Sequence, residues 1–477
     1  MRELWKHQIG AIQRAENSKD LFLGMEQGTG KTRTSIEILR RRYHKRGALM
    51  KTLIVSPVIV CDNWKKEFAM YSKISQEDII VLTQAGKIRQ REFLRAVGPE
   101  LKRAKIVVTN FAGLLMEDLF ALLVSWSPEI LVVDESHKVK GHSSKTAKKM
   151  CVIADRAQQK LLLTGTPILN SPMDLWMQFR ILDGGETFSK NFFAFRNQYF
   201  KDDNAHFSNK PSHFPKFVPS PGAFEAMQER IRPKMIRALK KDCLDLPPLV
   251  RQEVRVELSP EQKKMYKEMK DEFLTYLTSI EGTQPHAVVA NLAVVKSMRL
   301  QQIVSGYANT EQDGEKRIIN VPRIKVLQEL LEDITPGAKV IVWAVFKQNY
   351  KMIREMCEGI GIEYAQIHGD ISNAQRIEEM DRFRSDPKCR VMIANQSAGG
   401  TGVNLVEASY MIYYSKGFSL EHELQSEARN HRGGSEIHEK ITRIDLVAPG
   451  TIDEIINSAL QRKQSVADAI LAFRKDL

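Results

Sequence analysis

The chain of 477 residues is 43% hydrophobic and 27% charged, which allows two or three domains and excludes a disordered or fibrous protein. Its formal net charge of +13 indicates a polyanionic partner, most commonly nucleic acid. Five scattered cysteines without a C-x-x-C pair argue against a disulfide framework and a zinc site, and for a reducing compartment.

Neither a signal peptide nor a membrane span is expected. The first residues, MRELWK, are not followed by the apolar core of a signal peptide. The most apolar stretch, residues 114–126, is short and interrupted by Glu117 and Asp118. We therefore expect a protein of the cytoplasm that is not secreted.

A glycine-rich segment near the N-terminus predicts a phosphate-binding loop. The sequence GMEQGTGKT at 24–32 follows an apolar run and precedes a segment with helical spacing of apolar residues. Glycines let backbone N–H groups approach phosphates at a helix N-terminus. The predicted loop residues are Gly28, Thr29, Gly30, Lys31 and Thr32. Lys31 would contact the β- and γ-phosphates of ATP and Thr32 would hold Mg²⁺, although the strict pattern has glycine where this chain has Met25.

Short apolar runs alternate with amphipathic segments after this loop. Strands are predicted at residues 52–55, 79–82, 106–108, 130–133 and 161–163, and helices at 60–71, 89–97, 113–124 and 146–154. This alternation is typical of a parallel sheet covered by helices on both faces. Residues 1–182 are therefore expected to form a doubly wound α/β lobe.

The alternation stops and later resumes. Residues 183–250 are aromatic and basic, then rich in Pro, Ser and Lys, which predicts an insertion and a linker. The aromatic residues at 188–200 would form a small satellite core on the first lobe, or alternatively expose rings that stack on unpaired bases. Residues 251–477 predict a second α/β lobe, with helices at 260–277, 287–304 and 452–473 and strands at 340–343, 364–367, 391–394, 410–413 and 441–447.

Two acidic residues follow the predicted strand 130–133. Asp134 would stand at the carboxyl end of that strand, where a Mg²⁺ ligand is expected beside a phosphate loop. Glu135 would orient and deprotonate the attacking water. The alternative is a solvated cluster of charges in a loop.

Motifs along nearly the whole chain resemble those of the Swi/Snf-type family of DNA translocases, in the helicase superfamily with DEAD- and DEAH-type boxes. In the first lobe they are Leu4-x-x-His7-Gln8, the phosphate loop, Ser56-Pro57, Thr109-Asn110, the DExH box from Asp134 to His137, and Leu163-Thr164-Gly165-Thr166-Pro167. In the second they are His368-Gly369, the run from Ser397 to Leu405, and Gln425-x-x-x-Arg429-x-His431-Arg432.

This resemblance implies two RecA-like doubly wound lobes with the ATP site in the cleft between them, and it implies a role for each matched residue. Gln8 would read adenine, Gly402 would contact the nucleotide, and Arg429 and Arg432 would act as arginine fingers. Residues that couple the ATP state to the grip on DNA would be His137, Thr164, Gly165, Thr166 and Gln425. The expected partner is double-stranded DNA, and the residues that contact it would be Ser56, Thr109, Asn110, Lys138, Lys145, Gly369 and Thr401.

Three departures from the family pattern concern the substrate. Ser435 replaces the glutamine that usually ends the arginine motif, and Phe418-Ser419-Leu420 replaces Trp-Asn-Pro ahead of it. No bromo-, chromo- or histone-tail module is found in the chain. These departures argue against a chromatin substrate, and a motor this small suits a bacterium or a phage-infected cell.

The leading interpretation is a DNA-stimulated ATPase that translocates along duplex DNA. Three alternatives stay open: a helicase that separates strands of DNA or RNA, the motor subunit of a restriction or nuclease complex, and a scaffold that binds nucleic acid without hydrolysis. Lys31, Glu135 and both arginines argue against the scaffold, because binding alone would not need them.

Overall fold

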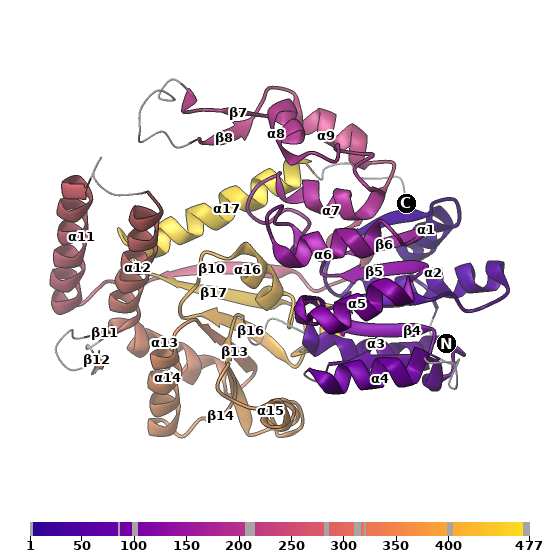
Figure 1. Ribbon diagram of the computed structural model, residues 1–477. Helices are drawn as coiled ribbons and strands as arrows, with labels where there is room; N and C mark the ends of the chain where they lie inside the picture. The colour runs from indigo at the N-terminus through magenta and orange to yellow at the C-terminus, as the bar shows by residue number, and fades with distance from the viewer. Residues whose placement is uncertain are drawn as a thin grey trace. The chain divides into compact units, whose positions relative to one another are not determined.

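The computed structural model describes residues 3–83, 86–97, 104–205, 215–280, 286–309, 316–318, 321–397 and 404–470 (Figure 1). These residues fall into two units. Within the described ranges the first unit contains the residues up to 205, then 215–245 and 463–470, and the second contains residues 246–462. Each unit is described by itself.

The first unit is built on a seven-stranded parallel sheet with the order β3-β4-β2-β5-β6-β1-β9. Its strands are β1 (Asp20–Met25), β2 (Thr52–Ser56), β3 (Ile79–Leu82), β4 (Ile106–Asn110), β5 (Ile130–Asp134), β6 (Gln159–Leu163) and β9 (Met235–Ala238). Leu21 and Leu23 pack in one hydrophobic cluster and Phe22 in another, as the alternation of side chains along a strand requires when both faces are covered. The predicted α/β lobe is confirmed.

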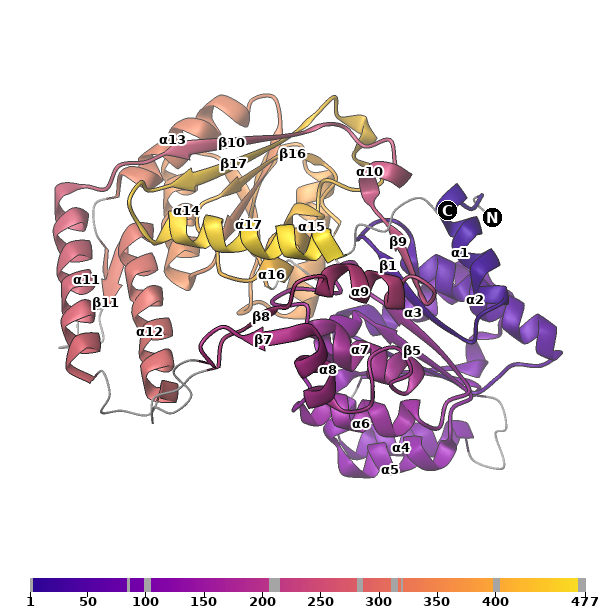
Figure 2. The same cartoon turned by 90° about the horizontal axis from the view of Figure 1, so that it is seen from above.

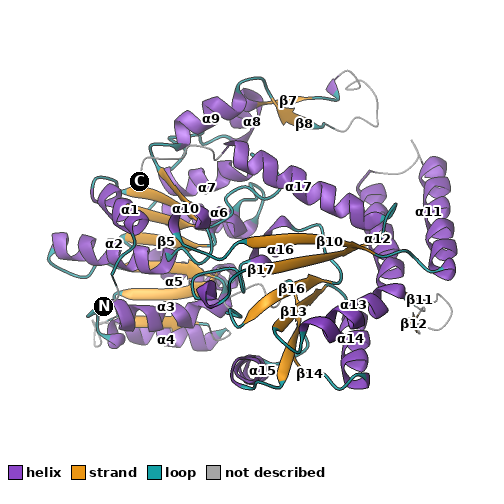
Figure 3. Ribbon diagram, turned by 180° about the vertical axis from the view of Figure 1, so that it is seen from behind, coloured by secondary structure: helices purple, strands orange, loops and turns teal. Residues whose placement is uncertain are grey.

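Helices cover both faces of this sheet (Figure 3). They are α1 (Lys6–Glu16), α2 (Lys31–Arg46), α3 (Val58–Tyr71), α4 (Lys87–Val97), α5 (Glu117–Trp126), α6 (Lys145–Ala154), α7 (Asp174–Asp183), α8 (Phe192–Tyr199), α9 (Ala223–Ile231) and α10 (Lys240–Cys243). The predicted start of the helix at 113–124 was wrong, because α5 begins at Glu117. The chain first makes a 3₁₀ turn, η2 (Phe111–Leu115), capped by the Asn110 side chain, and Met116 then leaves the helical region at ψ 113°.

The aromatic segment at 188–200 forms mostly core. Phe188, Phe195, Tyr199 and Phe200 are at most 4% exposed and pack in the same cluster as the sheet residues of the first unit. The predicted burial is therefore confirmed for these four rings, but they join the main core of the first unit instead of forming a separate one. Phe193 differs, because its side chain is 58% exposed. A short antiparallel pair follows, β7 (Phe200–Asp202) with β8 (Phe217–Pro219).

The second unit is built on a six-stranded parallel sheet with the order β10-β17-β16-β13-β15-β14. Its strands are β10 (Leu249–Arg255), β13 (Lys339–Ala344), β14 (Glu363–Ile367), β15 (Cys389–Asn395), β16 (Ala408–Tyr413) and β17 (Ile441–Val447). A small hairpin, β11 (Tyr307–Asn309) with β12 (Lys316–Ile318), lies outside this sheet. The second predicted α/β lobe is confirmed.

The helices of the second unit are α11 (Pro260–Ile280), α12 (His286–Ser305), α13 (Pro322–Ile334), α14 (Lys347–Gly359), α15 (Asn373–Ser385), α16 (Leu420–Glu427) and α17 (Ile452–Ile470). The long helices α11 and α12 run side by side (Figure 2). Helix α17 begins in the second unit, and its residues from Lys463 onward belong to the first. In the parts of the chain that the structure describes, no helix has the length and apolar composition needed to cross a bilayer.

Candidate nucleotide site and arginine motif

The predicted phosphate loop joins β1 to α2 in the first unit. Gly28 and Gly30 have φ values of 86° and 82°, in the left-handed region that favours glycine. Gly30 is also the N-cap of α2, so the loop leads directly into the positive end of that helix. A Cβ on Gly30 would lie 2.3 Å from Gln8 Nε2. This loop therefore has the backbone form that a phosphate cradle needs.

Two side chains of α1 hold the loop backbone in place. His7 Nε2 donates a hydrogen bond to the Thr29 carbonyl at 2.8 Å, and Gln8 Nε2 donates to the Gly30 carbonyl at 3.3 Å. Burial lowers the pKa of His7, and the bond to the Thr29 carbonyl partly opposes this effect. The family resemblance predicts that Gln8 reads adenine. The structure adds a role in fixing the loop, which His7 shares and which the sequence analysis did not assign to it.

The ammonium group of Lys31 lies against the loop carbonyls. Lys31 Nζ donates to the Met25 carbonyl at 3.0 Å and to the Glu26 carbonyl at 3.4 Å. The Thr29 hydroxyl also donates to Glu26, at 2.7 Å. Lys31 and the half-buried Thr32 form the first turn of α2. The predicted phosphate and metal residues of this segment thus lie together at the carboxyl end of β1.

Asp134 is the last residue of β5, two strands from β1 in the sheet. Its carboxylate is 5% exposed and accepts hydrogen bonds from Trp64 Nε1 at 3.1 Å and from the Glu135 backbone N–H at 3.0 Å. Burial, and then the charge of Glu135, raise the pKa of Asp134 well above its usual range, while Lys31 lowers it. A buried carboxylate with excess negative charge beside a phosphate loop is a chemistry that a divalent cation stabilises. The residues present therefore fit Mg²⁺.

Glu135 has a strained backbone, and its side chain bonds to the same hydroxyl group as His137. Its φ of 51° is unusual for a residue with a Cβ, and such strain is often found at functional sites. The Thr164 hydroxyl donates to Glu135 Oε2 at 3.4 Å and lies 2.8 Å from His137 Nδ1. Since that hydroxyl has one hydrogen, His137 Nδ1 is the donor to Thr164. The ends of β5 and β6 are thereby joined in one hydrogen-bonded cluster.

The predicted coupling segment after β6 also contacts the phosphate loop. The Thr166 backbone N–H donates to the Thr164 hydroxyl at 3.1 Å. A Cβ on Gly165 would lie 3.2 Å from Gln27 N and 3.2 Å from Glu26 Cα, both backbone atoms of the loop. The segment 164–166 thus lies directly between the DExH box and the loop.

The predicted DNA-contact residues of the first unit differ in exposure. Ser56 Oγ lies 3.2 Å from Cys61 Sγ, Thr109 Oγ1 donates to the Leu82 carbonyl at 3.2 Å, and both residues are fully buried. Asn110 Oδ1 accepts from the Gly113 N–H at 2.9 Å. The side chains with clear exposure in this group are Lys138 and Lys145.

In the second unit the arginine motif follows α16. Gln425 is 3% exposed and donates to Glu421 at 3.2 Å. Arg429 is 4% exposed, and its Nε donates back to the Gln425 carbonyl at 2.9 Å. Arg432 is half-buried. Arg429 is therefore buried and bonded to the preceding helix, whereas Arg432 is the more accessible of the two.

Three further predicted residues belong to the second unit. Gly369 follows β14 with open space around the position of a Cβ, so packing does not require glycine there. Thr401 and Gly402 lie outside the described residues.

Family models match most of the chain. The SNF2-related domain matches residues 11–316, and the Helicase conserved C-terminal domain matches residues 322–434. The chain belongs to the SNF2-related family. The SNF2-related match contains the phosphate loop and the DExH box, and the helicase C-terminal match contains the arginine motif. The predicted family, with its helicase-type domains, and the two α/β lobes are confirmed.

Relatives of this SNF2-related chain are large proteins. It is 26% identical to a chromodomain-helicase-DNA-binding protein 3 homolog of Caenorhabditis elegans, over 95% of this chain and 26% of the relative. It is 26% identical to the TATA-binding protein-associated factor MOT1 of Saccharomyces cerevisiae, over 94% of this chain and 26% of the relative. An uncharacterized ATP-dependent helicase of Mycoplasma pneumoniae is 25% identical over 96% of this chain and 40% of the relative.

Among solved structures, the Sulfolobus solfataricus SWI2/SNF2 ATPase core in complex with dsDNA is 21% identical. The match covers 99% of this chain and 93% of that one, with a TM-score of 0.44. Compared with the three relatives of the previous paragraph, the SNF2-related chain spans between 26% and 40% of their length.

Proposed function

We propose that this chain is a DNA-stimulated ATPase that couples ATP hydrolysis to translocation along duplex DNA. The observation that carries the proposal is the linked cluster of Glu135, Thr164 and Gly165 against the phosphate loop, inside an SNF2-related domain. This arrangement joins the predicted catalytic base to the segment that the family resemblance assigns to coupling. ATPase rates measured side by side with no nucleic acid, duplex DNA, single-stranded DNA and RNA test the proposal, and the highest rate is expected with duplex DNA.

In the first lobe, Lys31 would bind the β- and γ-phosphates of ATP. Thr32 and Asp134 would hold Mg²⁺, which when bound neutralises charge on the phosphates. The Glu135 carboxylate would accept the proton of the attacking water. Thr164 donates a hydrogen bond to that carboxylate and would keep it oriented. This hydrogen bond would change when the carboxylate takes up a proton.

The second lobe would supply Arg429 and Arg432 to the transferring phosphoryl group. Because these arginines belong to the opposite lobe, hydrolysis would require closure of the two lobes, and product release would let them open. Alternate closing and opening, with each lobe holding the same DNA, would move the protein along the duplex.

DNA would be held through its phosphates. Hydroxyl, amide and backbone groups fix register without reading sequence, which suits Gly369 and Thr401. The side chains of Ser56, Thr109 and Asn110 are buried, so these residues would contribute their backbone groups. The exposed Lys138 and Lys145 would add electrostatic attraction. Support comes from the net charge of +13 and from a relative named as a DNA-binding helicase.

Replacing Lys145 and Lys148 with Ala is expected to weaken duplex binding and to flatten its salt dependence. Both side chains are exposed on α6. Each phosphate contact that is lost should reduce the slope of log K against log salt by about 0.9. Fluorescence anisotropy over a salt series measures that slope, and Lys45→Ala at the far end of α2 is the matched control. Equal slopes in both variants would show that α6 does not face DNA.

Displacement of a triplex-forming third strand is expected to require ATP, with little unwinding of a forked duplex. Movement along duplex displaces the third strand, whereas strand separation needs a wedge. The candidate wedge is Phe193, which is 58% exposed with the Arg196 guanidinium 5.1 Å from its ring centre. Phe193→Ala should leave third-strand displacement unchanged. Efficient unwinding that Phe193→Ala removes, while ATPase activity persists, would favour the strand-separating helicase instead.

We also propose the functional division into an ATP-binding lobe at 1–182, an insertion and linker at 183–250, and a C-terminal lobe at 251–477. A cytoplasmic location, in a bacterium or a phage-infected cell, agrees with the relative from Mycoplasma pneumoniae. Fractionation of cells that express the native chain tests the location.

A further inference from the structure

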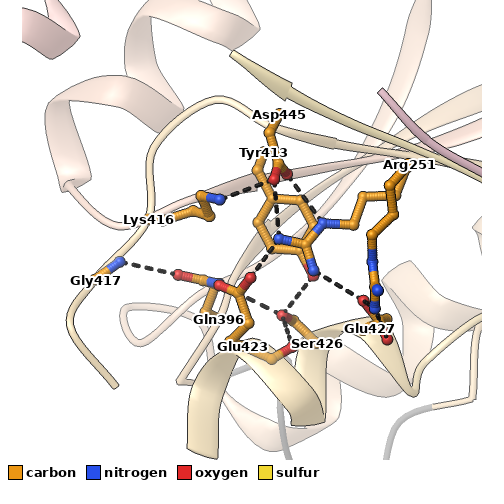
Figure 4. Close-up of polar contacts among 10 residues, drawn as sticks. Arg251, Gln396, Tyr413, Lys416, Gly417, Glu423, Ser426, Glu427 and Asp445 are labelled. Atoms are coloured by element: carbon orange, nitrogen blue, oxygen red, sulfur yellow. Dashed lines mark hydrogen bonds and ion pairs between the residues drawn. The ribbon is translucent and has the colours of Figure 1, made fainter. Parts of the chain in front are cut away.

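A buried arginine of the second unit binds three carboxylates. Arg443 on β17 is 4% exposed. Its Nη1 donates to Glu427 at 2.8 Å, its Nε donates to Asp445 at 3.0 Å, and its Nη2 donates to Glu423. Figure 4 shows these carboxylates turned toward one another from α16 and β17.

Two further cations complete the network. Lys416 Nζ lies 2.9 Å from Asp445, and Arg251 on β10 donates twice to Glu427, at 2.8 and 2.9 Å (Figure 4). The Arg443 guanidinium also lies 4.2 Å from the centre of the Tyr413 ring. Three cations thus face three carboxylates, so the network carries no net charge.

The network holds α16 by one face. Glu423 and Glu427 are four residues apart and therefore lie one turn apart on the same side of this helix. The Tyr413 hydroxyl lies 2.8 Å from Ser426 Oγ on the same helix. Strands β10, β16 and β17 each contribute a group, so the position and rotation of α16 are fixed against three strands of the sheet.

The arginine motif leaves directly from this helix. Arg429 follows the C-cap Ala428, and its guanidinium bonds back to the Gln425 carbonyl at 2.9 Å. A rotation of α16 would therefore move Arg429 and the segment that leads to Arg432.

We propose that Arg443 is a positioning residue for Arg429 and Arg432, acting through α16. The inference rests on the proposed role of those two arginines in ATP hydrolysis. Replacing a buried ion-pair network by apolar groups is often neutral for stability, so a network of this size is better explained by the single geometry that it imposes. Burial alone would raise the pKa of Glu427, but the charges of Arg443 and Arg251 keep it below its usual value, so the carboxylate stays ionised and holds both partners.

Arg443→Met tests the proposal. We expect kcat to fall on the order of 10²-fold, because a displacement of catalytic groups by about 1 Å costs that much. The KM for ATP should stay nearly unchanged, since the phosphate loop is on the other lobe and ground-state binding is kept. Hydrogen exchange of residues 420–432 should rise, which measures the proposed displacement without relying on catalysis.

Arg323→Met is the matched control. Arg323 on α13 is 2% exposed, donates to the Tyr414 carbonyl at 2.9 Å and pairs with Asp453, so it is a buried ion-paired arginine of the same unit. It should lower thermal stability without changing kcat or exchange at 420–432. Equal changes in both variants would overturn the proposal, because they would show a general loss of stability.

A second pair of variants keeps the test informative if Arg443→Met folds poorly. Glu423→Gln removes one bond of the network and should lower kcat by less. Added to Arg443→Met, it should restore part of the lost kcat, because it removes a carboxylate left without its cation. Unchanged exchange at 420–432 in all of these variants would refute the positioning role. Absence of ATPase activity in the wild-type chain would instead refute the proposed function.

Discussion

We expect Glu135→Gln to reduce ATP turnover by about 10²–10⁴-fold, the usual contribution of a general base, while ATP affinity changes little. The amide cannot accept a proton from water, yet its oxygen can still accept the hydrogen bond from the Thr164 hydroxyl. The cluster at the ends of β5 and β6 should therefore persist. Steady-state ATPase kinetics and titration with a fluorescent nucleotide measure the two effects separately.

Lys31→Ala and Glu117→Gln are the comparisons for this variant. Lys31→Ala should lose both binding and turnover, because it removes a cation that contacts the phosphates. Glu117 is 81% exposed at the surface, so Glu117→Gln should change neither quantity. Equal losses of affinity in Glu135→Gln and Lys31→Ala would contradict the separate roles of base and phosphate ligand.

Arg432→Ala is expected to reduce kcat by about 10³–10⁵-fold, the range found for arginine fingers. The guanidinium would neutralise charge that develops on the phosphoryl oxygens, so the loss should appear in kcat with little change in KM for ATP. Arg432→Lys should not restore the rate, because an ammonium lacks the planar fork of donors. Single-turnover hydrolysis at saturating ATP and DNA measures the effect.

Arg429→Ala is expected to change both kcat and stability, unlike Arg432→Ala. Arg429 is buried and bonds to the Gln425 carbonyl, so its loss should also lower the melting temperature. Arg382→Ala on the exposed face of α15 is the control for both arginines. A raised KM with unchanged kcat in Arg432→Ala would assign that residue to ATP binding rather than to the transition state.

Strong local patterns account for the parts of the fold that the sequence predicted. The unbroken apolar run 130–133 is typical of this, because β5 lies in the middle of its sheet and all five of its residues are buried. The phosphate loop was predictable for a similar reason, since Gly28 and Gly30 adopt backbone angles that other residues disfavour.

Two of the four edge strands, β9 and β10, were missed because their patterns are weak, whereas the edge strands β3 and β14 were predicted. β10 reads LVRQEVR and is mostly exposed, since it pairs with one neighbour only. β9 has four residues and follows a long segment without regular alternation. Parts of the site were missed because they depend on tertiary contacts. Nothing in the local sequence indicates that Trp64 donates a hydrogen bond to Asp134 or that Arg443 donates hydrogen bonds to three carboxylates.

The placement of β9 sets an order of events for the growing chain on the ribosome. Phe22 of β1 pairs with Met235 of β9, so the strand that leads to the phosphate loop has an open hydrogen-bonding edge until Met235 has been synthesised. Contacts between such distant parts of a chain form slowly, because a long loop must close first. The nascent first lobe would therefore expose a β1 edge able to pair with other chains. Truncation before β9 should yield a protein that aggregates, whereas truncation just after Asp245 should not.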